Sequence, residues 1–127
     1  MGIGDFWGAA DKLTRDADAD NILMYMQLML RTAKQAGLTV TRDMLREHGR
    51  DVPLFEGLRD MSWFDRINAF GANYGLTIKH YILSSGLQEM VEGCPIHPAF
   101  EHIFASHYVY NDTVSYTHLT LPTILRV

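Results

Sequence analysis

The stretch Thr77-Ile78-Lys79-His80-Tyr81-Ile82-Leu83-Ser84-Ser85-Gly86 decides the fold of this chain. Its first seven residues are rich in β-branched and aromatic side chains, which predicts a β-strand. Two serines and a glycine follow, and this pattern predicts a turn that closes the strand at residues 84–86. A helix is expected next, ending at Gly93. A strand, a small polar turn and a helix in this order indicate an α/β unit with parallel strands.

A second strand is expected further along the chain. After Pro95 and Pro98 the sequence predicts a short helix over Ala99–Phe104 and then a strand over His107–Tyr110. The second half of the chain therefore reads as α/β.

Three helices are expected before the first strand, and the first and third have apolar residues at spacings of three or four. The segments and their boundary signals are Asp20 to Gly37 with Asp20 as N-cap, Arg42 to His48 with Thr41 as N-cap, and Leu58 to Phe70 ending at Asn73-Tyr74-Gly75. The first of these is apolar almost all round. We expect it to be buried on more than one side, within a parent larger than this chain or in an interface.

Composition limits the chain to one domain at most. It has 127 residues, 11 Lys+Arg against 15 Asp+Glu, a formal charge of −4 and 47% hydrophobic residues. This balance is typical of a soluble globular protein and argues against nucleic acid or an anionic membrane as the main partner. No stretch reaches the roughly 18 consecutive apolar residues of a membrane span. The single cysteine, Cys94, excludes an internal disulfide and fits a cytoplasmic protein.

The last residues, 113–127, differ from the rest of the chain. Residues 114–123 read Val-Ser-Tyr-Thr-His-Leu-Thr-Leu-Pro-Thr, which resembles the conceptual translation of a transposase-based sequencing adapter. We therefore expect residues 113–127 to be an artefactual tail and the natural sequence to end near Asp112. The alternative is a genuine C-terminal strand, because threonines and leucines alternate there.

The middle of the chain carries a family resemblance. The turn Leu54-Phe55-Glu56-Gly57-Leu58, a helix with Trp63-Phe64, then Gly75, and the strand end Ile82-Leu83-Ser84-Ser85-Gly86 together resemble the haloacid dehalogenase-like hydrolase superfamily. Its members commonly have a Pro-Gly-type turn, an amphipathic helix, a glycine and a hydrophobic strand that ends in Ser or Thr. Glu56 departs from this pattern, because many members have proline there.

The resemblance covers essentially Asp5 to Asp112 and implies an architecture. Residues 1–53 would be a mainly α-helical cap region. Residues 54–112 would be part of a Rossmann-like core that contains the second-motif strand. The chain would then be an internal fragment, truncated at both ends.

The resemblance also implies a function for the parent protein: a Mg²⁺-dependent phosphatase that acts on a small phosphorylated metabolite through an aspartyl-phosphate. The second-motif Ser or Thr of the family hydrogen-bonds the transferring phosphoryl oxygen, and by position this residue is Ser84. Ser85 and Gly86 would supply backbone donors nearby. The family's nucleophilic aspartate, lysine and acidic magnesium motif have no match in this chain, so we expect the chain alone to be inactive.

Other interpretations stay open. The Ser-Ser-Gly segment could be only a helix cap in which Gly86 eases the turn. The chain could also be a non-enzymatic interaction module whose helix Ile22–Ala36 docks a partner. Two further clusters are weaker candidates: Asp16–Asp20 contains Asp-x-Asp but follows no hydrophobic strand, and the spacing of Cys94, His97, His102 and His107 fits no established zinc finger.

Overall fold

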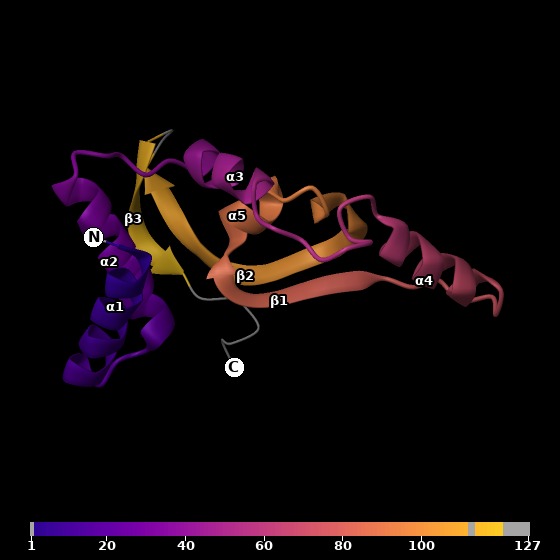
Figure 1. Cartoon of the computed structure of the whole chain (residues 1–127), viewed down its shortest axis with the longest axis horizontal. Helices are drawn as coiled ribbons and strands as arrows, with labels where there is room; N and C mark the ends of the chain where they lie inside the picture. The colour runs from indigo at the N-terminus through magenta and orange to yellow at the C-terminus, as the bar shows by residue number, and fades with distance from the viewer. Residues whose placement is uncertain (1, 112–113, 121–127) are drawn as a thin grey trace.

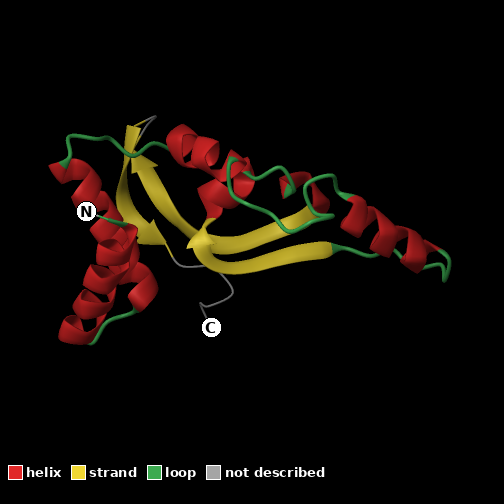
Figure 2. Cartoon of the chain, viewed as in Figure 1, coloured by secondary structure: helices red, strands yellow, loops and turns green. Residues whose placement is uncertain are grey.

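The computed structural model describes residues 2–111 and 114–120 and has a mixed helix and strand architecture (Figure 1, Figure 2). The described elements are α1 (Ile3–Ala17), α2 (Asn21–Gln35), α3 (Arg42–Arg50), α4 (Ser62–Ala72), β1 (His80–Leu87), α5 (Gln88–Gly93), the 3₁₀ turn η1 (His97–Ala99), β2 (Phe100–Asn111) and β3 (Val114–Thr120).

The strands form one sheet in the order β1-β2-β3. β1 and β2 run parallel, with Ile82 opposite Ile103 and Ser84 opposite Ala105. The chain crosses from β1 to β2 through α5 and η1. This arrangement confirms the expected α/β unit with parallel strands.

β1 is shifted along the sequence from its expected position. The strand covers His80–Leu87 and runs through residues 84–86, so the prediction that a turn closes it there is wrong. Between the pairs Ser84–Ala105 and Leu87–Ser106, β1 advances by three residues while β2 advances by one. The small residues therefore form a bulge, in which the strand bends without leaving the sheet.

The helix predicted over Ala99–Phe104 is also wrong. Only the turn η1 precedes Phe100, where β2 begins. The backbone from Phe100 onward pairs with β1, and Ile103 and Ala105 are buried at the alternating spacing of a strand. A short apolar run fits both the helical period and the alternating period of a strand. Here the pairing with β1 selects the strand.

The capping signals of α2 and α3 are confirmed. The Asp20 carboxylate accepts hydrogen bonds from the backbone of Ile22 and Leu23 at 2.9 and 3.1 Å, and Gly37 follows the helix with a φ of +73°. The Thr41 hydroxyl accepts from the backbone N–H of Met44 at 3.1 Å. Side-chain caps of this kind satisfy N–H groups that have no partner within the helix.

Two helices differ from the expectation. α4 begins at Ser62 rather than Leu58, because Met61 has a φ of +67°, which lies outside the helical region. The helix α1 was not predicted, and it packs along α2 (Figure 1).

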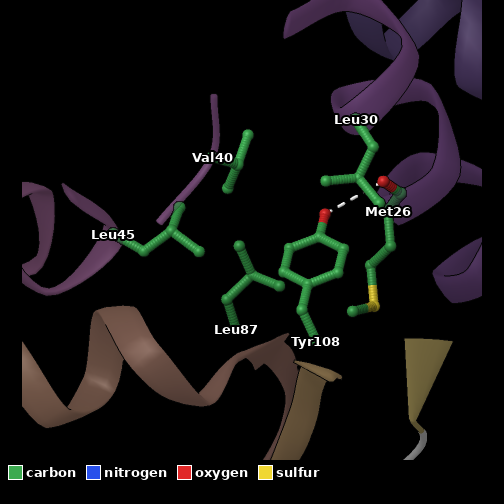
Figure 3. Close-up of a cluster of buried hydrophobic side chains, with 6 residues drawn as sticks. All are labelled: Met26, Leu30, Val40, Leu45, Leu87 and Tyr108. Carbon is green, nitrogen blue, oxygen red and sulfur yellow. Dashed lines mark hydrogen bonds between the residues drawn. The ribbon is translucent and has the colours of Figure 1, made fainter. Parts of the chain in front are cut away.

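The main core lies between α2, α3 and the carboxyl ends of the parallel strands. Figure 3 shows its buried side chains, which converge from these elements around the ring of Tyr108. They are Met26, Leu30, Val40, Leu45, Leu87 and Tyr108. A second cluster of Phe64, Cys94 and Ile96 holds α4 to the region around η1.

β3 lies on the segment that the sequence sets apart as a tail. It pairs antiparallel with β2, from His107 opposite Thr120 to Asn111 opposite Val114. Backbone groups make this ladder, so it fits a genuine strand and a translated adapter equally well. Asp112, the expected natural end, and residues 121–127 lie outside the described residues.

Candidate functional site

The candidate site is the bulge at the carboxyl end of β1. In open α/β sheets, ligands bind outside the carboxyl ends of parallel strands. At this end β1 bends through residues 84–86 and continues into α5, while β2 runs on beside it (Figure 1). All three residues implied by the resemblance therefore lie in one short segment at the appropriate edge of the sheet.

Ser84 is partly buried, and its hydroxyl oxygen accepts a hydrogen bond from the backbone N–H of Gly86 at 2.9 Å. A serine hydroxyl can accept and donate at the same time. Among the residues that the structure describes, no acceptor takes the hydroxyl hydrogen of Ser84. Ser84 can therefore donate this hydrogen to a ligand oxygen.

The neighbouring peptide group contributes differently from the expectation. The resemblance implies that Gly86 supplies a backbone donor to the ligand, but here its N–H is bonded to Ser84 Oγ. The carbonyl oxygen of Ser85 accepts a hydrogen bond from the Tyr25 hydroxyl at 2.7 Å. The bulge is thus held from within by Gly86 and from α2 by Tyr25.

Tyr25 is a site residue that sequence reasoning missed. It precedes Ser85 by 60 residues, and its helix pattern indicates only an apolar core position. Its ring lies 5.5 Å from that of Trp7, centroid to centroid. Burial raises the pKa of Tyr25 to about 12, and the Glu89 carboxylate adds to this effect. Tyr25 therefore keeps its proton at neutral pH and acts as a donor.

Glu89 is the buried acidic residue beside the bulge, with an exposed fraction of 3%. Its Oε1 accepts from the backbone N–H of Tyr108 at 3.2 Å, just beyond the last pair of β1 and β2 at Leu87 and Ser106. Burial raises the pKa of Tyr110, and the nearby Glu89 carboxylate raises it further. Glu89 therefore continues the hydrogen bonding of the sheet at the point where β1 becomes α5.

The weaker metal candidates do not come together in the described part of the chain, where no three His, Cys, Asp or Glu side chains form a group. Cys94 is buried in the second cluster, and the His102 ring packs on Phe104 at 4.5 Å. Asp16 pairs with Lys12, and Asp20 caps α2. These residues do not fit a Mg²⁺ site.

We compared the chain with protein-family models, with curated proteins and with solved structures, and none of them matches it. None of the described helices is long and apolar enough to cross a membrane.

Proposed function

We propose that this chain is part of a haloacid dehalogenase-like hydrolase, a phosphatase for a small phosphorylated metabolite, in which Ser84 hydrogen-bonds the transferring phosphoryl oxygen. One observation carries the proposal. Ser84 lies at the carboxyl end of a parallel strand, accepts the Gly86 N–H, and has its own hydrogen available for a ligand. The family resemblance of residues 54–86 supplies the reaction class.

The contribution of Ser84 follows from this geometry. Its oxygen is fixed by Gly86, so the hydroxyl hydrogen is restricted to directions away from that N–H. A donor already oriented toward a phosphoryl oxygen stabilises the charge on that oxygen without reorganising during the reaction. We assign Ser84 this binding and stabilising role.

The remaining chemistry belongs to the parent protein on this proposal. The nucleophilic aspartate, the lysine and the Mg²⁺ ligands lie in parts of the parent outside this chain. We therefore expect no magnesium-dependent turnover of p-nitrophenyl phosphate by the purified chain. Turnover that is retained after repurification would refute the proposal that the catalytic residues lie outside this chain.

The proposal also assigns roles to the two halves. Residues 1–53 belong to a helical cap region that covers the site and selects the substrate, and residues 54–112 belong to the core. The partner is a small phosphate ester in the cytoplasm rather than a nucleic acid.

The test uses the full protein encoded by the source DNA. Ser84→Ala removes one donor to the phosphoryl group and should lower kcat/KM for a phosphate ester by about 10²- to 10³-fold. Tyr81→Phe is the matched control, because it removes one hydroxyl from the same strand on the face opposite Ser84. A Ser84→Ala enzyme as active as this control would contradict the assignment.

The alternative, an interaction module built on the helix from Ile22 to Ala36, gains no support from a specific observation. Met26, Leu28 and Leu30 of this helix are buried within the chain's own fold. A defined stoichiometric complex with one protein partner would revive it.

A further inference from the structure

Two tyrosine hydroxyls join α2 to the carboxyl ends of the parallel strands. Tyr25, on α2, donates to the carbonyl oxygen of Ser85 on β1 at 2.7 Å. Tyr108, on β2, donates in the opposite direction to the carbonyl oxygen of Met26 on α2 at 2.9 Å (Figure 3). Tyr25 and Met26 are adjacent, so one turn of α2 is bonded to both strands where the candidate site lies.

The bond from Tyr25 acts on a particular peptide group. The Ser85 carbonyl and the Gly86 N–H belong to the same planar peptide unit, so they turn together. The oxygen of this unit accepts from Tyr25 at 2.7 Å, and its N–H donates to Ser84 Oγ at 2.9 Å. Rotation of the peptide plane would break both bonds.

Tyr25 is itself held in place. Its ring is partly buried and packs on Trp7 of α1, and the adjacent Met26 is fully buried in the main core. Little side-chain freedom remains to be lost when the hydroxyl bonds to Ser85. The donor is therefore preorganised by residues that lie far from β1 in the sequence.

We propose that Tyr25 is a positioning residue for Ser84: its hydroxyl holds the Ser85–Gly86 peptide, and the N–H of that peptide fixes the direction of the Ser84 hydroxyl. The use of Ser84 to bind a phosphoryl group rests on the proposed function, whereas the fixed peptide does not. The same bond ties the helical region that precedes the core to the site.

Amide hydrogen exchange followed by NMR tests the fixed peptide in the chain itself. Tyr25→Phe removes only the hydroxyl, and we expect the Gly86 amide to exchange about tenfold faster, as for the loss of one ordinary hydrogen bond. The Ala105 amide in the parallel ladder is the internal reference, and Tyr81→Phe is the matched control. Unchanged Gly86 exchange, or an equal rise at Gly86 and Ala105, would overturn the positioning role.

Titration of the full protein encoded by the source DNA with inorganic phosphate, followed at the amides of residues 84–86, tests the consequence for the site. Tyr25→Phe should weaken binding about tenfold by the same reasoning, and Ser84→Ala should abolish it. Equal affinity in the wild type and Tyr25→Phe would overturn the positioning role. If Gly86 exchange responds to Tyr25→Phe but phosphate shifts no amide in the wild type, the proposed function fails while the fixed peptide stands.

Discussion

Glu92, near the end of α5, is bonded through both oxygens of its carboxylate. Arg46 donates from Nε and Nη2 to Oε2 at 2.9 and 2.7 Å, and Gln88 donates to Oε1 at 2.9 Å. Burial by itself raises the pKa of this carboxyl, but the hydrogen bonds from Gln88 and Arg46 and the Arg46 charge outweigh burial and lower it. The charged form of Glu92 therefore stabilises the contact between α3 and α5.

A lowered carboxyl pKa gives a defined pH dependence. The stabilisation is present above the ordinary glutamate pKa and is lost as the pH falls through the folded-state value. Glu92→Gln should therefore lose less stability than the wild type between about pH 5 and about pH 3, measured by urea unfolding at each pH. Glu47→Gln, at an exposed position on α3, is the control. Parallel pH profiles for the wild type and Glu92→Gln would contradict this account.

Residues of the candidate site differ in how far the sequence predicts them. Ser84 follows from its place at the end of a strand that is rich in β-branched and aromatic residues. The role of the Gly86 N–H does not, because a bulge and a turn have the same small-residue signal. Tyr25 could not be predicted, because its partner lies 60 residues away and depends on how α2 packs.

Helices α3 and α5 approach closely because each places a glycine against the other's backbone. A Cβ built on Gly93 would lie 1.8 Å from the carbonyl oxygen of Arg46, and one built on Gly49 would lie 2.0 Å from that of Met90. No side chain fits at these distances without moving a helix. The close approach brings Arg46 to Glu92 and places α5 at the end of β1.

Gly93→Ala should force these two helices apart. We expect a loss of about 1–3 kcal/mol in the free energy of unfolding, the usual cost of overpacking. Gly8→Ala is the matched control, because this glycine is inside α1 and, apart from its neighbours and its own helix backbone, no atom of the described residues lies within 4 Å of an added Cβ. Alanine should stabilise by about 0.5–1 kcal/mol. Urea unfolding of both variants measures the difference. A Gly93→Ala chain as stable as the wild type would contradict the close approach.

The elements were predictable where a local signal sets their limits. Asp20 and Thr41 begin α2 and α3 as expected, because a capping side chain acts within its own first turn. The prediction of where β2 begins was wrong, because the apolar residues of 99–104 fit both the helical and the strand period. Pairing with β1 selects the strand. Tertiary contacts of this kind cannot be predicted from the sequence of one segment alone.

In the whole molecule, the described elements cover the parallel pair on one side only. Ile103 and Ala105 are buried, whereas Tyr81 and Leu83 are 49% and 61% exposed on the other face of β1. Parallel sheets are normally covered on both faces. β1 is also an edge strand. The proposed function accounts for both features, because further core layers of the parent would pack on the uncovered face.

The exposed aromatic side chains of α4 fit the same account. Figure 1 shows this helix extending away from the sheet, and Phe70 is 64% exposed. Phe64 anchors the helix to the second cluster. Under the proposed function, the rest of its apolar surface would contact parts of the parent core.

We have proposed that this chain is an internal part of a haloacid dehalogenase-like hydrolase, and sequencing the source DNA across both ends tests this proposal. We expect an open reading frame that encodes a hydrophobic strand followed by Asp-x-Asp upstream of Met1. We also expect core motifs to follow Asp112 in place of residues 113–127. Stop codons before Met1, together with a genomic origin for residues 113–127, would refute the proposal.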